Sequence, residues 1–150
     1  PAPLGKYAWY LQNSDTRATG EQETQEVGKK LPNPWGLYDI YGNVNEWVMD
    51  QYAADYYTTL GTGLVTDPCN IPKTLYPRIV RGGSYQSSAA ACRSSKRRAS
   101  SASWKQQDPS YTKSAWYHTD ATFVGFRIVR PLAIPSADVM YRCWNQGLPE

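Results

Sequence analysis

The sequence predicts an α+β domain that is rich in loops and poor in regular secondary structure. Its 150 residues are 41% hydrophobic, which is enough for one buried core. Six Trp and twelve Tyr stand against two Phe, so most large aromatic side chains carry a polar group that can hydrogen-bond to irregular backbone. Eleven Gly and eleven Pro are spread along the chain and interrupt any long helix or strand.

The first third of the chain predicts short elements separated by polar loops. Residues Lys6 to Leu11 form an aromatic run of strand-forming residues, whereas residues 16–30 are polar and indicate a surface loop. The dipeptide Gly42-Asn43 predicts a turn, and a short helix is expected from Val44 to Asp50.

The rest of the chain predicts two further strands and two long connections. Residues 52–77 are irregular and contain several prolines, and a connection of this length is usually functional or disordered. A strand is expected at Arg78 to Val80, followed by a Gly-Gly pair that permits close backbone approach. Residues 99–120 form a second polar and aromatic excursion, and the alternation over Phe123 to Val129 predicts a strand.

The expected core contains Trp47, Tyr85 and Phe126, because each is a large apolar residue near a glycine turn. The tail, residues 131–150, is too apolar for a plain disordered end. We expect it to dock on a partner or on an upstream segment, with residues 140–144 at or near the contact.

The net charge of +3 is small, but Lys96, Arg97 and Arg98 follow Arg93 in a run of serines. Such a run can bind phosphate or nucleic acid. No aromatic stacking array or nucleic-acid module accompanies it, so we interpret it as a solvated turn beside a strand and expect no nucleic-acid partner.

The sequence contains no apolar stretch near the roughly 20 residues that a membrane span requires, and no start typical of a signal peptide. Three cysteines, Cys69, Cys92 and Cys143, leave several states open. These are one disulfide with a free thiol, three free thiols, or a bond to another segment.

A candidate cation site lies between Asp39 and Glu46. Together with Gly42 and Asn43 these residues offer two carboxylates, an amide and turn carbonyls within eight residues. Hard cations such as Ca²⁺ prefer oxygen ligands of this kind. Taken alone, two acids at this spacing more often cap a helix or face solvent.

Three stretches carry a resemblance to a known family. They are PNPWGLYDIYGNVNEWVMD over residues 32–50, RIVRGGSY over residues 78–85 and GFRIVR over residues 125–130, roughly forty residues apart. This layout resembles the C-terminal half of the formylglycine-generating enzyme or sulfatase-modifying factor family, related to the PvdO-like and ergothioneine-pathway nonheme-iron enzymes. The resemblance implies a loop-rich variant of the C-type-lectin-like fold over residues 1–130, with residues 131–150 as a C-terminal extension.

For the cation site, the resemblance implies structural Ca²⁺. Asp39 and Glu46 would give side-chain oxygens, and Gly42 and Val44 would give backbone carbonyls. Family domains carry about as much sequence again before this point. We therefore expect an upstream half of the same protein, or another subunit, to cover the exposed side of the domain.

For catalysis, the resemblance implies a serine at Ser84 and a copper-binding cysteine pair at positions 87 and 92. Here the pair reads Ser87 and Cys92. A hydroxyl is hard and stays protonated, so it replaces a Cu(I) thiolate ligand poorly. Asn45 also replaces the family's usual tryptophan, and the one histidine, His118, cannot build a three-histidine iron site.

Two functions follow from these observations. The first is a calcium-stabilised binding or structural module without the copper oxidase chemistry, whose aromatic loops, residues 52–66 and 104–118, contact a protein or a glycan. The alternative is an oxidoreductase, either a formylglycine-type oxidase that uses Cys92 and Ser84 or the accessory half of a nonheme-iron enzyme. Because members of the family in bacteria are often exported, the resemblance implies a periplasmic or secreted location.

Overall fold

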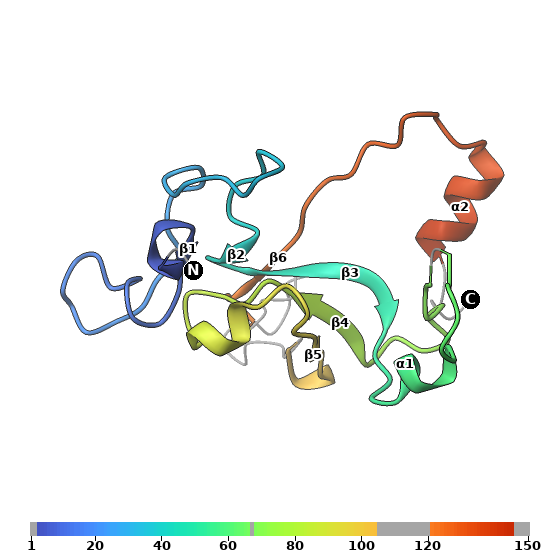
Figure 1. Cartoon of the computed structure of the whole chain (residues 1–150), viewed down its shortest axis with the longest axis horizontal. Coiled ribbons are helices and arrows are strands. Elements are labelled where there is room, and N and C mark those ends of the chain that lie inside the picture. The colour runs from blue at the N-terminus through green and yellow to red at the C-terminus, as the bar shows by residue number, and fades with distance from the viewer. Residues whose placement is uncertain (1–2, 67, 105–120, 146–150) are drawn as a thin grey trace, which may run out of the picture. The chain divides into compact units, whose positions relative to one another are not determined.

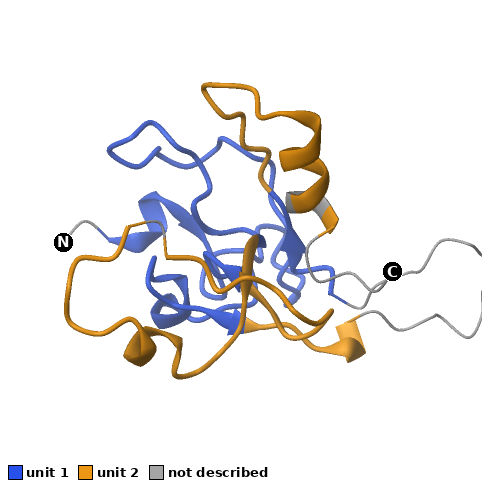
Figure 2. Ribbon diagram, turned by 90° about the vertical axis from the view of Figure 1, so that its right-hand side faces the viewer, with its two compact units in different colours: residues 1–47, 80–98, 121–126 blue, residues 48–79, 99–120, 127–150 orange. Residues whose placement is uncertain are grey.

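The computed structural model describes residues 3–66, 68–104 and 121–145 of the chain (Figure 1). The chain divides into two compact units, which Figure 2 shows in different colours. Unit 1 consists of Pro1–Trp47, Val80–Arg98 and Ala121–Phe126, and unit 2 of Val48–Ile79, Ala99–Asp120 and Arg127–Glu150.

The fold is mixed α and β, with short elements joined by long loops, as the glycine and proline content predicts. In chain order the elements are the 3-10 helix η1 (Leu4–Lys6), β1 (Ala8–Trp9), β2 (Tyr41–Gly42), β3 (Asn45–Gln51), α1 (Tyr56–Thr59), β4 (Arg78–Arg81), η2 (Ala89–Cys92), β5 (Arg98–Ala99), η3 (Ala102–Trp104), β6 (Val124–Gly125) and α2 (Ala137–Asn145).

In unit 1, strands β1 and β2 form a parallel pair in which Ala8 lies opposite Tyr41 and Trp9 opposite Gly42. The predicted turn follows β2, and Gly42 (φ 75°) and Asn43 (φ 59°) both adopt left-handed backbone conformations. The Asn43 amide donates to the Trp9 carbonyl at 2.7 Å. A Cβ on Gly42 would overlap that carbonyl oxygen, so both the conformation and the close approach require glycine here.

The second sheet has the strand order β5-β4-β3-β6. The helix expected from Val44 to Asp50 is wrong, because this segment contains β3. In unit 1, Asn45 pairs with Val124 and Glu46 with Gly125 in a parallel ladder, and the Asn45 amide donates to the Phe123 carbonyl at 2.8 Å. Neighbouring strands satisfy the backbone of β3, and such tertiary pairing outweighs a local helical preference.

The other predicted strands form in part. The strand at Arg78 to Val80 is confirmed as β4, which ends at Arg81. Of the expected strand over residues 123–129, only β6 forms, and of Lys6 to Leu11, only β1.

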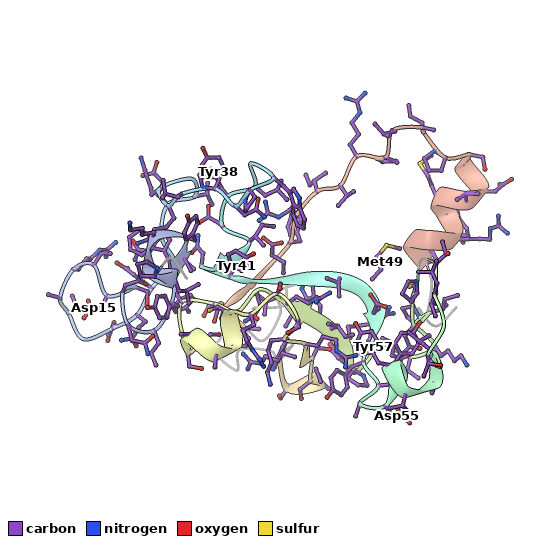
Figure 3. All side chains as sticks on the ribbon, viewed as in Figure 1. Asp15, Tyr38, Tyr41, Met49, Asp55 and Tyr57 are labelled. Atoms are coloured by element: carbon purple, nitrogen blue, oxygen red, sulfur yellow. The ribbon has the colours of Figure 1, made fainter. Side chains whose placement is uncertain are left out.

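The buried apolar residues are mostly small, and they confirm one of the three expected core residues. Among the described residues they are Ala8, Ile79, Val80, Tyr85, Cys92 and Ala121. Trp47 is 41% exposed and Phe126 is 75% exposed, so both predictions are wrong. Alternation along β3 places Trp47 on the same face as the exposed Met49, which Figure 3 labels, and Phe126 follows the end of β6.

We predict that Gly42→Ala strongly destabilises unit 1. The new Cβ would meet the Trp9 carbonyl and would also hold alanine at positive φ. Urea unfolding should show a loss of several kcal/mol, beyond the roughly 1–2 kcal/mol that a left-handed non-glycine residue costs.

The matched control is Gly36→Ala, because Gly36 has nearly the same φ of 77° but no atom within 4 Å of an added Cβ. It should show the conformational cost alone. Equal losses for the two variants would contradict a role for the close approach.

Candidate functional site

The glycine-serine turn after β4 forms a compact hydrogen-bonded unit. The Ser84 amide donates to Ser87 Oγ at 2.9 Å, the Ser87 amide donates to the Ser84 carbonyl at 2.9 Å, and the two hydroxyls lie 3.2 Å apart. The Gln86 amide also donates to Ser84 Oγ at 3.3 Å. Ser84 is fully buried, so the Ser87 hydroxyl satisfies an amide that would otherwise lie unpaired beside it.

Cys92 closes η2 and packs against the same turn. It is 1% exposed, and a Cβ on Gly83 would lie 2.7 Å from its Sγ. Burial raises the pKa of the Cys92 thiol. The thiol is therefore held in its protonated form, which is neither a good nucleophile nor a good metal ligand.

The positions that would form the copper pair hold one buried thiol and one hydroxyl, and that hydroxyl already bonds to the Ser84 amide. Cu(I) is soft and is bound by thiolates, which a hydroxyl does not replace. The residues present do not fit a two-thiolate copper site.

The candidate calcium loop contains one feature that fits a cation. Asp39 adopts a left-handed conformation (φ 54°), and its Oδ2 accepts a hydrogen bond from the Gly28 amide at 2.7 Å. Its Oδ1 is buried and has no hydrogen-bond partner. An orphaned carboxylate oxygen of this kind suits a Ca²⁺ ligand.

The other expected calcium ligands lie in the turn and on β3. Gly42 donates its amide to the Gly82 carbonyl at 2.8 Å, Val44 follows the turn, and Glu46 is half-buried on β3. The described residues contain no group of three or more His, Cys, Asp or Glu able to hold a metal. A cation here would therefore depend on backbone carbonyls and water in addition to the two carboxylates.

Two cavities in unit 1 were not predicted. One, of about 390 Å³, is lined by Tyr7, Pro32, Asn33, Pro34 and Tyr41. Figure 3 labels Tyr41 on β2 and Tyr38 in the loop before it. Aromatic and proline side chains line most of this cavity, which suits an apolar or ring-containing ligand.

The other cavity, of about 220 Å³, lies beside the glycine-serine turn. Its lining residues are Asn45, Val80, Gly83, Ser87, Ala91, Lys96, Arg97 and Arg98. The basic run that we interpreted as a solvated turn therefore borders a cavity. The signal in the sequence was the polar Asn45 at a position where the family usually has tryptophan.

Several residues that the sequence predicts to make contacts lie outside the described part of the structure. His118 and residues 105–118 of the second aromatic loop are not described, nor are the side chains of Cys143 and Trp144. Among the residues that are described, no helix has both the length and the apolar character needed to cross a membrane.

The sequence comparison defines the class of protein. The model of the sulfatase-modifying factor enzyme 1-like domain family matches residues 4–132, and the chain belongs to this family. The family predicted from the three motifs is thereby confirmed.

The chain is similar to two kinds of curated protein. It is 36% identical over 78 residues to a formylglycine-generating enzyme of Thermomonospora curvata. The aligned stretch covers 52% of this chain and 25% of the enzyme. It is 38% identical over 65 residues to a serine/threonine-protein kinase, pkn1, of Chlamydia pneumoniae. That aligned stretch covers 43% of this chain and 10% of the kinase. The chain thus spans a quarter or less of these relatives.

Among solved structures, the chain resembles Treponema denticola variable protein 1. The TM-score is 0.52 and the identity 32%, over 82% of this chain and 35% of that protein. The likeness extends over most of the elements described above, whereas most of the other protein lies outside the match.

We predict that Cys92 resists alkylation in the native protein while Cys69, which is exposed, reacts first. Peptide mapping after iodoacetamide treatment should show Cys92 modified only after unfolding in urea. Equal native labelling of the two thiols would contradict the buried position of Cys92.

The raised pKa of Cys92 also gives a pH dependence. Its contribution to stability should be complete below the ordinary thiol pKa of 9.0 and lost as pH rises toward the higher native pKa, since the unfolded thiol ionises first. Cys92→Ala, melted over the same pH range, should lack this loss.

Proposed function

We propose that the chain is a binding module of the sulfatase-modifying factor family that lacks the copper oxidase chemistry. One observation carries the proposal: Ser87 stands where the second thiolate would be needed, and its hydroxyl bonds to the Ser84 amide. The serine keeps the turn folded, which a binding scaffold requires. The alternative, an oxidoreductase that uses Cys92 and Ser84, gains no support from a single protonated thiol.

Exposed apolar residues after β6 support a binding role. Phe126, Ile128, Val129, Leu132 and Ile134 are all exposed. Large apolar residues in an extended segment mark surfaces that contact other proteins. We propose that a protein covers this segment, either a partner or an upstream part of the same protein, with α2 at or near the contact.

A second exposed group in unit 1 supports contact with an additional ligand. Trp35 is 85% exposed, and Leu31 is also exposed. Both lie in the loop that supplies Pro32 and Pro34 to the aromatic cavity. An exposed tryptophan beside such a cavity can stack on a sugar ring, so a glycan is the second ligand class that we propose here.

Three finer features belong to the same proposal. The fold is taken as a variant of the C-type-lectin-like fold, the location as periplasmic or secreted, and the loop from Asp39 to Glu46 as a structural Ca²⁺ site. The orphaned Oδ1 of Asp39 supports the last of these. In that site Asp39 and Glu46 give carboxylate oxygens, and Gly42 and Val44 give carbonyls.

We predict that the native protein has no tight Cu(I) site at residues 87 and 92. Competition against bicinchoninate should give the same Cu(I) affinity for wild type and Cys92→Ser. Ser87→Cys should raise the affinity at least about tenfold, because it supplies the missing ligand.

The matched control is the double variant Ser87→Cys/Cys92→Ser, which should lose this gain. Tight Cu(I) binding by wild type that disappears in Cys92→Ser would overturn the proposal and restore the oxidase alternative.

We predict that chelation lowers the melting temperature if the calcium site is present. A cation whose free concentration is about 100 times its dissociation constant stabilises the folded state by about 2.7 kcal/mol. This corresponds to several degrees in the melting temperature of a domain of this size. Asp39→Asn should abolish the response to EGTA, while still accepting the Gly28 hydrogen bond and tolerating the left-handed conformation.

Asp15→Asn is the control, since the Asp15 carboxylate accepts from the Thr19 and Gly20 amides in a different loop. It should keep the full EGTA response. Identical melting of wild type with EGTA and with added Ca²⁺ would remove calcium from the proposal.

A further inference from the structure

The cavity beside the glycine-serine turn has an unusual combination of walls. Some of its lining residues are small and apolar, namely Val80, Gly83 and Ala91. Others carry nitrogen or hydroxyl groups, namely Asn45, Ser87 and residues 96–98. Among the described residues that line it, none carries a carboxylate. At about 220 Å³ the cavity is smaller than the roughly 300–1,000 Å³ of a drug-sized site, so it suits a small group.

Asn45, one of the lining residues, has an unpaired side-chain donor. The residue is only 3% exposed, and its backbone is fixed in β3 through the bond to the Phe123 carbonyl. Its side-chain Nδ2 is buried and has no hydrogen-bond partner. An unpaired buried donor lowers stability, so a donor in this position points to an acceptor that binds in the cavity.

Ser87 offers a second donor. Its Oγ accepts from the Ser84 amide at 2.9 Å and lies 3.2 Å from Ser84 Oγ. When Ser84 donates to Ser87 across that hydroxyl pair, the Ser87 proton is free to point into the cavity. The two neutral donors are side chains of residues whose backbone is hydrogen-bonded, Asn45 on β3 and Ser87 in the turn.

Three consecutive cations complete the lining. Arg97 is half-buried, and the Arg98 guanidinium lies 4.4 Å from the centre of the Phe123 ring. Lys96 and Arg98 are exposed, and partial burial lowers the pKa of Arg98. Such cations favour an anion over a neutral ligand, because charge-assisted hydrogen bonds are roughly twice as strong as neutral ones.

We propose that this cavity binds a small oxyanion. The side-chain Nδ2 of Asn45, the Ser87 hydroxyl and the cations of residues 96–98 would all contact it. The bound group is a carboxylate, or a sulfate or phosphate, carried by a ligand of the module. A nucleic-acid backbone would need an extended basic surface in place of one cavity.

The inference deepens the proposed binding function and rests on it, since it assigns a ligand class to the place where copper chemistry would occur. The same substitution that removes the thiolate supplies a hydroxyl donor. The two proposals can fail separately. Cu(I) affinity of the Cys92 variants tests the lack of copper chemistry, and anion binding by variants of the basic run tests the oxyanion site.

The experiment is an NMR titration of the full chain at constant ionic strength with sodium phosphate, sulfate or acetate, and sodium chloride as the reference. The Asn45 side-chain amide resonance should shift and saturate with phosphate and sulfate if the ligand carries a tetrahedral oxyanion, or with acetate if it carries a carboxylate. Lys96→Gln and Arg97→Gln should each weaken the binding at least about tenfold, as expected for a lost charged hydrogen bond.

Arg93→Gln is the matched control. Arg93 lies in the same basic run and is exposed, its Nε donates to the Ala90 carbonyl at 3.1 Å, and it does not line the cavity. This variant removes the same charge, and its affinity should stay within about twofold of wild type if binding at the cavity is local. A linear response to all anions, or equal weakening by Arg93→Gln and Arg97→Gln, would overturn the proposal. Melting curves of each variant exclude loss of folding as the cause.

Discussion

The turn at Gly42 and Asn43 is the constraint on which the rest of unit 1 depends. Within two residues it binds two separate parts of the chain, strand β1 and residues 82–85. The Asn43 amide donates to the Trp9 carbonyl at 2.7 Å, its carbonyl accepts from the Tyr85 amide at 2.8 Å, and the Gly42 amide donates to the Gly82 carbonyl at 2.8 Å. Left-handed conformations at both residues allow these groups to point in different directions at once.

The Asn43 side chain extends this control to the polar loop before it. Its Oδ1 accepts from the Gln25 amide at 3.0 Å and its Nδ2 donates to the Gln25 carbonyl at 2.9 Å. Tyr85, positioned by Asn43, accepts a hydrogen bond from Ser14 Oγ at its carbonyl, 2.9 Å away. Hydrogen bonds to the backbone therefore hold the glycine-serine turn to the rest of unit 1.

Polar groups, more than a large apolar core, hold this unit together. Ser14, Asn33, Asn43, Asn45 and Ser84 are buried. Each buried polar group lowers stability unless it is paired, and most of these are paired with backbone. Trp9 Nε1, Asp39 Oδ1 and Asn45 Nδ2 are buried and lack hydrogen-bond partners. The proposed cation would give Asp39 Oδ1 a partner, and the proposed anion would give one to Asn45 Nδ2.

The sequence alone determined the family, from three motifs, and the loop-rich class, from the glycine and proline content. It also determined the turn at Gly42, the strand at β4 and the burial of Tyr85, because these features lie within or beside short glycine-containing motifs. Only the tertiary structure decided that residues 45–51 form a strand, since the partners of β3 are distant in sequence. It also exposed Trp47 and Phe126 and brought the basic run beside Asn45. Side-chain burial depends on which segments pack together, and local residue patterns do not specify that packing.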